Sequence, residues 1–220
     1  MTKNILMVVT NVDHFHDGKH KTGLWFEEFA IPFITFLENG YHVKVASIKG
    51  GKAPLDPASE NLIKDIKWHD AKNAIEDTAR LDQVDYTLYD AIVFPGGHGP
   101  MYDIAESELV GDIVSYFDQN SKLIAAVCHG PAGLLKAKTN GNYIIAGKRV
   151  TCFTNEEEQC YKKDTLVPFS LEDALKERNA FFVEQPAGEI NVVVDGNIIT
   201  GQNYQSSQNF ADTIVKYFEE

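Results

Sequence analysis

The chain has 220 residues, 44% of them hydrophobic, which is enough to bury the core of one globular domain. Its 20 basic and 32 acidic residues give a formal charge of −12, and no basic stripe interrupts this negative charge. We therefore expect no nucleic acid partner, because phosphate binding requires clustered lysine and arginine. The sequence lacks a signal peptide pattern and any run of about 18 apolar residues, which predicts a cytoplasmic protein with no membrane contact.

Apolar runs typical of buried strands alternate along the chain with amphipathic helical runs. In chain order we expect strand Ile5–Thr10, helix Leu24–Asn39, strand Val43–Ile48, helix Ala71–Arg80, strand Ala91–Pro95, helix Ser107–Asn120, strand Leu123–Val127, helix Gly130–Ala137, strand Lys148–Thr151, helix Leu171–Arg178, strand Phe181–Glu184, strands Asn191–Val194 and Ile198–Thr200, and helix Ser207–Phe218. This alternation predicts an α/β fold with a mostly parallel central sheet and helices on both faces. The last two strands form a small hairpin, and no linker divides residues 1–220 into separate domains.

Three of the expected strands end in residues suited to a reaction site. Gly96, Gly97 and His98 follow one strand, and Cys128 follows another with a helical run directly after it. Ligands bind at the carboxyl ends of parallel strands. A thiol on such a strand-to-helix elbow would have its pKa lowered by the helix N-terminus, which could also hold an oxyanion. The third strand leads to the acidic run 156–158, which could also be a solvated helix start.

The first helix carries two adjacent glutamates in an apolar sequence. At about 100° per residue, Glu27 lies on the same side as Glu38, whereas Glu28 lies beside Leu24 and Ile31. We therefore predict that Glu28 is buried and Glu27 faces solvent. A buried carboxyl has a raised pKa, which suits a catalytic acid or base.

Cysteine and histidine positions limit the mechanism further. Cys128, Cys152 and Cys160 show no metal-binding spacing; Cys152 is expected to be a buried hydrophobe, while Cys160 could lie at the surface or at a pocket edge. All seven histidines lie at or before position 129, which excludes triads whose histidine follows the nucleophile at a distance. The partners left for Cys128 are His129 and carboxylates such as Glu28 and Glu158, and we interpret His98 as a turn residue.

Several separated motifs resemble the ThiJ/PfpI superfamily, in particular its heat-shock chaperone and glyoxalase III branch. The motifs are 125–131 around Cys128, 94–99 around the glycine pair, 21–28 leading to Glu28, 54–57, 167–172 and 200–203 with 206–207. The resemblance spans the whole chain. It implies a class I glutamine amidotransferase-like fold, which is a flavodoxin-like three-layer sandwich, in a single domain over residues 1–220.

The resemblance also implies roles for individual residues. Cys128 would be the nucleophile, His129 its neighbour in a triad, and Glu28 the buried acid that contacts the thiol. The third triad member would be Glu158, with Glu157 second and Asn155 at a position where some relatives have aspartate. The N–H groups of Gly97 and His129 would form an oxyanion hole, and Gly96 and His98 would lie at the substrate.

The implied activity is glutathione-independent conversion of methylglyoxal, or a related 2-oxoaldehyde, to a 2-hydroxy acid such as D-lactate. The thiolate would add to the aldehyde, and no metal or cofactor is required. The implied partners are small reactive aldehydes and a second copy of the chain in a homodimer. Alternatives are a stress chaperone or redox sensor that uses the same cysteine and, less favoured, a protein or nucleotide deglycase, an amidase or a peptidase.

Overall fold

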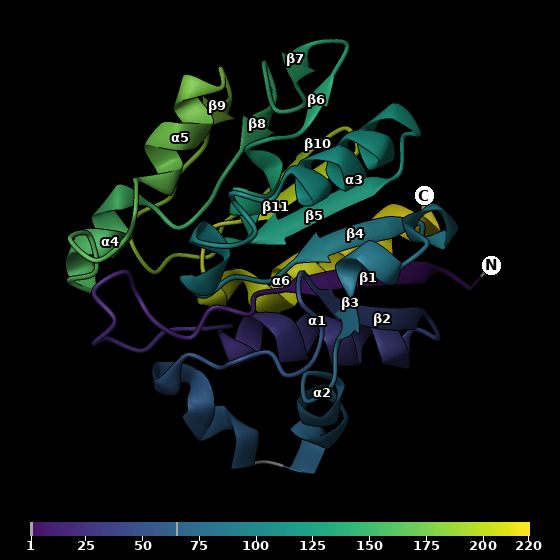
Figure 1. Cartoon of the computed structure of the whole chain (residues 1–220). Coiled ribbons are helices and arrows are strands. Elements are labelled where there is room, and N and C mark those ends of the chain that lie inside the picture. The colour runs from purple at the N-terminus through teal and green to yellow at the C-terminus, as the bar shows by residue number, and fades with distance from the viewer. Residues whose placement is uncertain (1, 65) are drawn as a thin grey trace.

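A seven-stranded sheet forms the centre of the molecule (Figure 1). The computed structural model describes residues 2–64 and 66–220. The strand order is β10-β11-β5-β4-β1-β2-β3, and every neighbouring pair is parallel except β10 and β11. The strands are β1 (Asn4–Val9), β2 (His42–Ser47), β3 (Ala79–Arg80), β4 (Ala91–Phe94), β5 (Leu123–Val127), β10 (Val192–Asp195) and β11 (Ile198–Gly201). The predicted flavodoxin-like α/β fold is confirmed.

The central strands are buried on both faces, which explains their continuous apolar sequences. Successive side chains of β1 alternate between two cores: Leu6 and Val8 face one, and Ile5, Met7 and Val9 face the other. All five are fully buried. Strands β4 and β5 follow the same alternation, so three neighbouring strands support a core on each side of the sheet.

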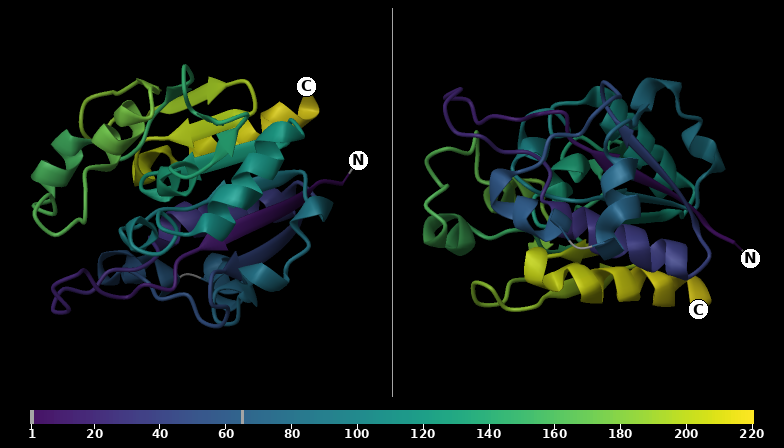
Figure 2. Two further views of the ribbon diagram at one scale, coloured as in Figure 1. Left: turned by 45° about the horizontal axis from the view of Figure 1, so that its top comes forward. Right: turned by 90° about the horizontal axis from the view of Figure 1, so that it is seen from below.

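Helices cover both faces of the sheet. On one face α1 (Phe26–Glu38) and α6 (Ser207–Glu219) lie side by side, with α2 (His69–Ala74) against α1 (Figure 2). On the other face lies α3 (Glu108–Gln119), whose first turn is capped by the Ser107 hydroxyl accepting from the Val110 N–H. None of the helices in the described ranges is long and apolar enough to cross a bilayer.

Residues 148–190 contribute a small lobe beyond the carboxyl ends of the central strands, drawn in green in Figure 1. It contains α4 (Asn155–Cys160), α5 (Leu171–Glu177) and the two-residue parallel pair β8 (Arg149–Val150) and β9 (Phe181–Phe182). The hairpin of β6 (Lys138–Thr139) and β7 (Asn142–Tyr143) precedes it. The short 3-10 turns are η1 (Pro57–Lys64), η2 (Ile66–Trp68), η3 (Leu81–Gln83), η4 (Tyr86–Leu88), η5 (Gly99–Met101), η6 (Gly130–Leu134) and η7 (Tyr204–Ser206).

Two expected helices were wrong in extent or type. The helix predicted over 71–80 ends at Ala74, because Thr78 bonds to Ser47 and to the Gly51 backbone, which draws the chain to the sheet edge as β3. The helix predicted after Cys128 is the 3-10 turn η6. Gly130 there packs so tightly on the Phe94 carbonyl that an added Cβ would lie 2.0 Å from its oxygen.

Candidate active site

Cys128 lies at the end of β5 in a left-handed conformation, with φ of +59°. Such a backbone costs a non-glycine residue about 1–3 kcal/mol and persists only where its surroundings fix it. Here the Cys128 N–H donates to the Gly201 carbonyl and the Phe153 N–H donates to the Cys128 carbonyl, both over 2.9 Å. The elbow predicted from sequence is therefore present, held between β11 and the lobe.

Glu28 projects from α1 toward the thiol, and the prediction that it is buried is confirmed. Its exposed fraction is 0%, and neither carboxyl oxygen makes a hydrogen bond of normal geometry with another described residue. A Cβ added to Gly96 would lie 2.5 Å from Glu28 Oε2 and 2.8 Å from Cys128 Cβ. Gly96 thus leaves the space in which carboxyl and thiol meet.

Burial raises the pKa of both groups in this pair. The pKa of Glu28 rises well above its ordinary value because the carboxyl is desolvated, which favours the protonated acid. Desolvation and then the neighbouring Glu28 raise the pKa of the Cys128 thiol. The predicted lowering of the thiol pKa is therefore wrong: a 3-10 turn supplies no long helix dipole, and Cys128 is only 5% exposed. The redox-sensor alternative assumed an exposed thiol of low pKa, a premise the structure contradicts.

His129 connects the thiol to a carboxylate of the lobe. Its Nδ1 lies 3.2 Å from Cys128 Sγ, and its Nε2 lies 2.6 Å from Glu158 Oε1. Burial alone would raise the pKa of Glu158, but the His129 and His98 imidazoles outweigh it and hold the pKa well below its usual range. An ionised Glu158 accepts a hydrogen bond from the protonated Nε2 of His129. This leaves His129 Nδ1 unprotonated and able to take the proton of the thiol.

The structure separates the three candidates for the third triad position. Glu158 reaches His129, whereas Glu157 closes the capping box with Thr154 and accepts from the Asn203 amide. The Asn155 side chain accepts from the Ser170 hydroxyl and donates to Asp173. Glu158 is 6% exposed, so the solvated helix start considered from sequence does not describe it.

His98 lies in the turn expected from sequence, at the N-cap of η5, but it is also buried and lines the cavity at Cys128. It is 8% exposed, its Nε2 lies 3.1 Å from Glu158 Oε2, and its ring centroid lies 4.1 Å from that of His129. Among the described residues, His98, His129 and Glu158 are a group of three whose ligand atoms are close enough for a metal ion, within 4.8 Å. Each imidazole is hydrogen-bonded to one oxygen of Glu158, which is also the arrangement of a proton relay.

The glycine pair places a backbone donor at the thiol. Gly97 has φ of +85°, and a Cβ there would lie 2.2 Å from the Gly23 carbonyl, so the position requires glycine. The Gly97 N–H faces Cys128, where it lowers the thiol pKa against the larger effect of burial. The Gly97 N–H is thus placed as an oxyanion donor would be.

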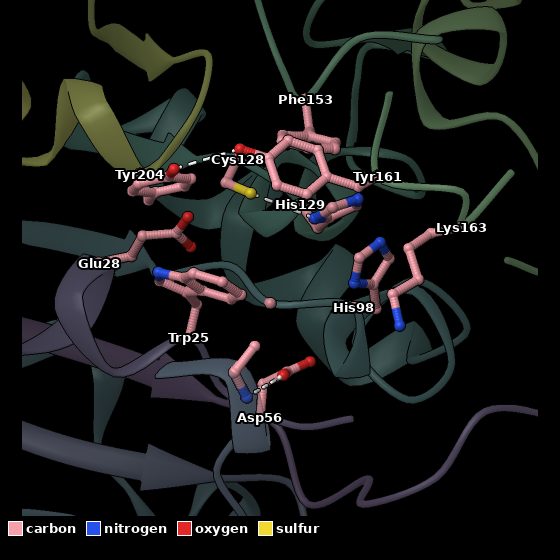
Figure 3. Close-up of a pocket in the computed structure, with 12 residues that line it drawn as sticks. Trp25, Glu28, Asp56, His98, Cys128, His129, Phe153, Tyr161, Lys163 and Tyr204 are labelled. Atoms are coloured by element: carbon pink, nitrogen blue, oxygen red, sulfur yellow. Dashed lines mark hydrogen bonds between the residues drawn. The ribbon is translucent and has the colours of Figure 1, made fainter. Parts of the chain in front are cut away.

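A cavity of about 140 Å³ opens above Cys128 (Figure 3). This volume is far below the roughly 300–1,000 Å³ of drug-sized sites. Besides the predicted residues, its walls contain a set that sequence reasoning missed: Trp25, Asp56, Ala58, Phe153, Tyr161, Lys163 and Tyr204. Trp25 and Asp56 lie in motifs that carry the family resemblance, whereas no pattern marked the residues that the lobe contributes.

Aromatic side chains close one side of the cavity. Trp25 stacks on Tyr204 with ring centroids 5.3 Å apart, and the Tyr204 hydroxyl lies 3.1 Å from that of Tyr161. This hydrogen bond, with burial, raises the pKa of Tyr204 to about 12. Tyr204 is therefore neutral and forms, with Trp25, an uncharged wall that suits a small uncharged substrate.

The other two cysteines are remote from this chemistry. Cys152 is fully buried, as predicted. Cys160, for which the sequence left two possibilities, is exposed on α4.

Comparison with known proteins supports the resemblance stated from sequence. The glutathione-independent glyoxalase HSP31 of Saccharomyces cerevisiae is 30% identical over 95% of each chain. The solved Rapid Encystment Protein 24 kDa of Francisella tularensis is 35% identical, with a TM-score of 0.90 over 98% of each chain. Glyoxalase III of Candida albicans, 24% identical over 97% of this chain and 96% of that one, shares the fold with a TM-score of 0.81. The model of the DJ-1/PfpI family matches residues 25–217, and the chain belongs to that family.

Proposed function

We propose that the protein is a glutathione-independent glyoxalase of the glyoxalase III type. It would convert a 2-oxoaldehyde and water to a 2-hydroxy acid, with methylglyoxal giving D-lactate. One observation carries the proposal: Cys128 faces a small cavity between a buried Glu28, whose pKa is raised, and the His129–Glu158 pair. The names of relatives such as HSP31, a glutathione-independent glyoxalase, support it.

The first step joins the aldehyde to the thiol. Cys128 Sγ attacks the aldehyde carbon C1, His129 Nδ1 accepts the thiol proton, and the Glu28 carboxyl protonates the aldehyde oxygen. Because His129 removes the proton on contact with substrate, the raised thiol pKa does not prevent attack. The product is a hemithioacetal, with Glu28 now a carboxylate and His129 an imidazolium paired to Glu158.

The second step moves hydrogen between the two carbons. A carboxylate in a site that disfavours its charge is a strong base, so Glu28 removes the C1 proton while His129 protonates the ketone oxygen, which gives an enediol. Glu28 then returns its proton to C2, and His129 takes the proton on the C1 oxygen. This leaves a 2-hydroxyacyl thioester on Cys128, which water hydrolyses to the free acid.

The test is turnover of methylglyoxal by purified protein without glutathione, with lactate as the measured product. We expect Cys128→Ala to lower the rate by about 10³-fold or more, because the covalent route is lost. Cys160→Ala is the matched control, since this thiol is exposed and outside the cavity, and it should retain wild-type turnover. Equal activity in Cys128→Ala would refute the nucleophile.

A further inference from the structure

His98 is a buried histidine with no role in the proposed formation of the thioester on Cys128. Its ring packs between Phe15, at 5.2 Å between centroids, and His129, at 4.1 Å. It shares the Glu158 carboxylate with His129, one imidazole on each oxygen. A histidine that only supported Glu158 would have no need to line the substrate cavity, yet His98 does so.

The hydrogen bond to Glu158 fixes the tautomer of His98. An ionised carboxylate only accepts, so Nε2 carries the proton and Nδ1 is an unprotonated acceptor. Burial, together with the neighbouring His129, lowers the pKa of His98 and keeps it neutral. Within the described part of the chain Nδ1 has no hydrogen-bond partner, and the ring lines the cavity, between Trp25 and Lys163 in the view of Figure 3.

The other acid–base groups next to Cys128 are His129 and Glu28, which already have roles in the proposed reaction. His129 has one nitrogen on Glu158 and the other on the sulfur, where it must return a proton when the thiolate leaves. The Glu28 carboxyl, whose oxygens are buried, serves the proton transfers at the two substrate carbons. Thioester hydrolysis needs a base that a water molecule can reach, and His98 Nδ1 meets that need.

We propose that His98 is the general base that activates the hydrolytic water, an inference that rests on the proposed function. Nδ1 takes one proton as the water oxygen bonds to C1 of the thioester. The C1–S bond then breaks, and His129 returns its proton to Sγ. The released 2-hydroxy acid gives its proton to the Glu28 carboxylate, and His98 loses its proton to solvent.

His98→Gln separates this role from simple support of Glu158. The glutamine amide can still donate to Glu158 but has no basic nitrogen, and His98→Asn serves if the first variant is unstable by urea unfolding. With methylglyoxal we expect steady-state lactate formation to fall by about 10²–10⁴-fold. Intact mass should show one lactoyl group accumulating on the protein and absent from Cys128→Ala. Hydroxylamine, which needs no base to attack a thioester, should release it as the hydroxamate and restore turnover.

Other outcomes decide against the role of His98. Wild-type turnover in His98→Gln, or loss of lactate without an acyl adduct, would overturn it and leave the proposed function standing. No lactate from the wild-type protein would overturn the proposed function and, with it, this inference.

Discussion

At the scale of single residues, the raised pKa of the Glu28 carboxyl serves the proposed chemistry but lowers the free energy of unfolding at neutral pH. The folded-state pKa of Glu28 is raised well above the ordinary value of 4.5, so folded Glu28 keeps its proton to a higher pH than the unfolded chain does. The native state then binds more protons than the unfolded state, so this residue makes the free energy of unfolding fall as pH rises above about 4.5. A protonation needed for catalysis therefore lowers stability at neutral pH.

Replacing Glu28 by glutamine should stabilise the protein at neutral pH, because the amide resembles the protonated acid and does not ionise. We expect the urea midpoint of Glu28→Gln to exceed that of the wild type at about pH 7 and to approach it at about pH 4. A midpoint below the wild type at both pH values would show that the carboxyl is ionised in the folded protein.

The role of a residue could be predicted where the local sequence pattern determines whether its side chain is buried. It could not be predicted where tertiary packing determines which way the side chain points. Helical spacing on α1 distinguished buried Glu28 from Glu27, and a thiol directly after an apolar strand predicted the elbow at Cys128. Glu157 and Glu158 are neighbours in α4, both buried, and only the packing of the lobe turns one toward His129. The raised thiol pKa likewise depends on a carboxyl 100 residues away in sequence.

At the scale of elements, α4 is fixed by the Glu157 carboxylate. Oε1 accepts from the Gly188 N–H and the Asn203 amide, while Oε2 accepts from the Thr154 N–H and, at 3.3 Å, the Gln202 amide. These donors come from three separate segments, so one carboxylate ties α4 to the loops that precede β10 and follow β11. The same helix carries Glu158 to His129.

Glu157→Gln should loosen this element. An amide would place two N–H donors among groups that also donate, and an unsatisfied buried donor costs about 1–3 kcal/mol. We expect the free energy of unfolding at neutral pH to fall by that amount. Glu156→Gln is the matched control on the same helix, because Glu156 is exposed, and its urea midpoint should be unchanged. Equal midpoints for the two variants would count against the anchoring role of Glu157.

The central strands were predictable because burial on both faces gives a continuous apolar run. Three of the two-residue strands, β3, β6 and β7, were not predicted, because two residues are too few to show a period of two. The equally short β8 and β9 lie within longer runs that were predicted as strands. β3 forms because Thr78 is bonded to the chain beside β2, a long-range contact that no local pattern reports. Turn η6 follows from the close contact between Gly130 and Phe94, which depends on the register of β4 and β5.

At the scale of the whole molecule, both cores share the same strands, and the lobe contributes to both. Val150, Leu171 and Leu175 lie in one core and Phe153 in the other. Residues 1–220 are therefore expected to unfold as one domain. Far-ultraviolet circular dichroism and tryptophan fluorescence should give coincident urea transitions. The fluorescence of Trp25 reports unfolding at the cavity, and that of Trp68 reports unfolding at η2. A fluorescence transition that differs from the circular dichroism transition would show that parts of the chain unfold independently.

The family resemblance also predicts a homodimer. Sedimentation equilibrium should give a mass twice that of the 24.6 kDa chain. A mass of one chain across the concentration range would contradict this expectation.

The central claim is that the buried Glu28 carboxyl moves the proton between the two carbons of a substrate bound to Cys128. Its most direct test is the rate of lactate formation from methylglyoxal by Glu28→Gln, beside Glu27→Gln, the half-buried neighbour on the same helix. An amide can neither protonate the aldehyde oxygen nor move the C1 proton, so Glu28→Gln should lose about 10²–10⁴-fold in turnover, and Glu27→Gln should behave as the wild type. Turnover by Glu28→Gln at the wild-type rate would contradict the account.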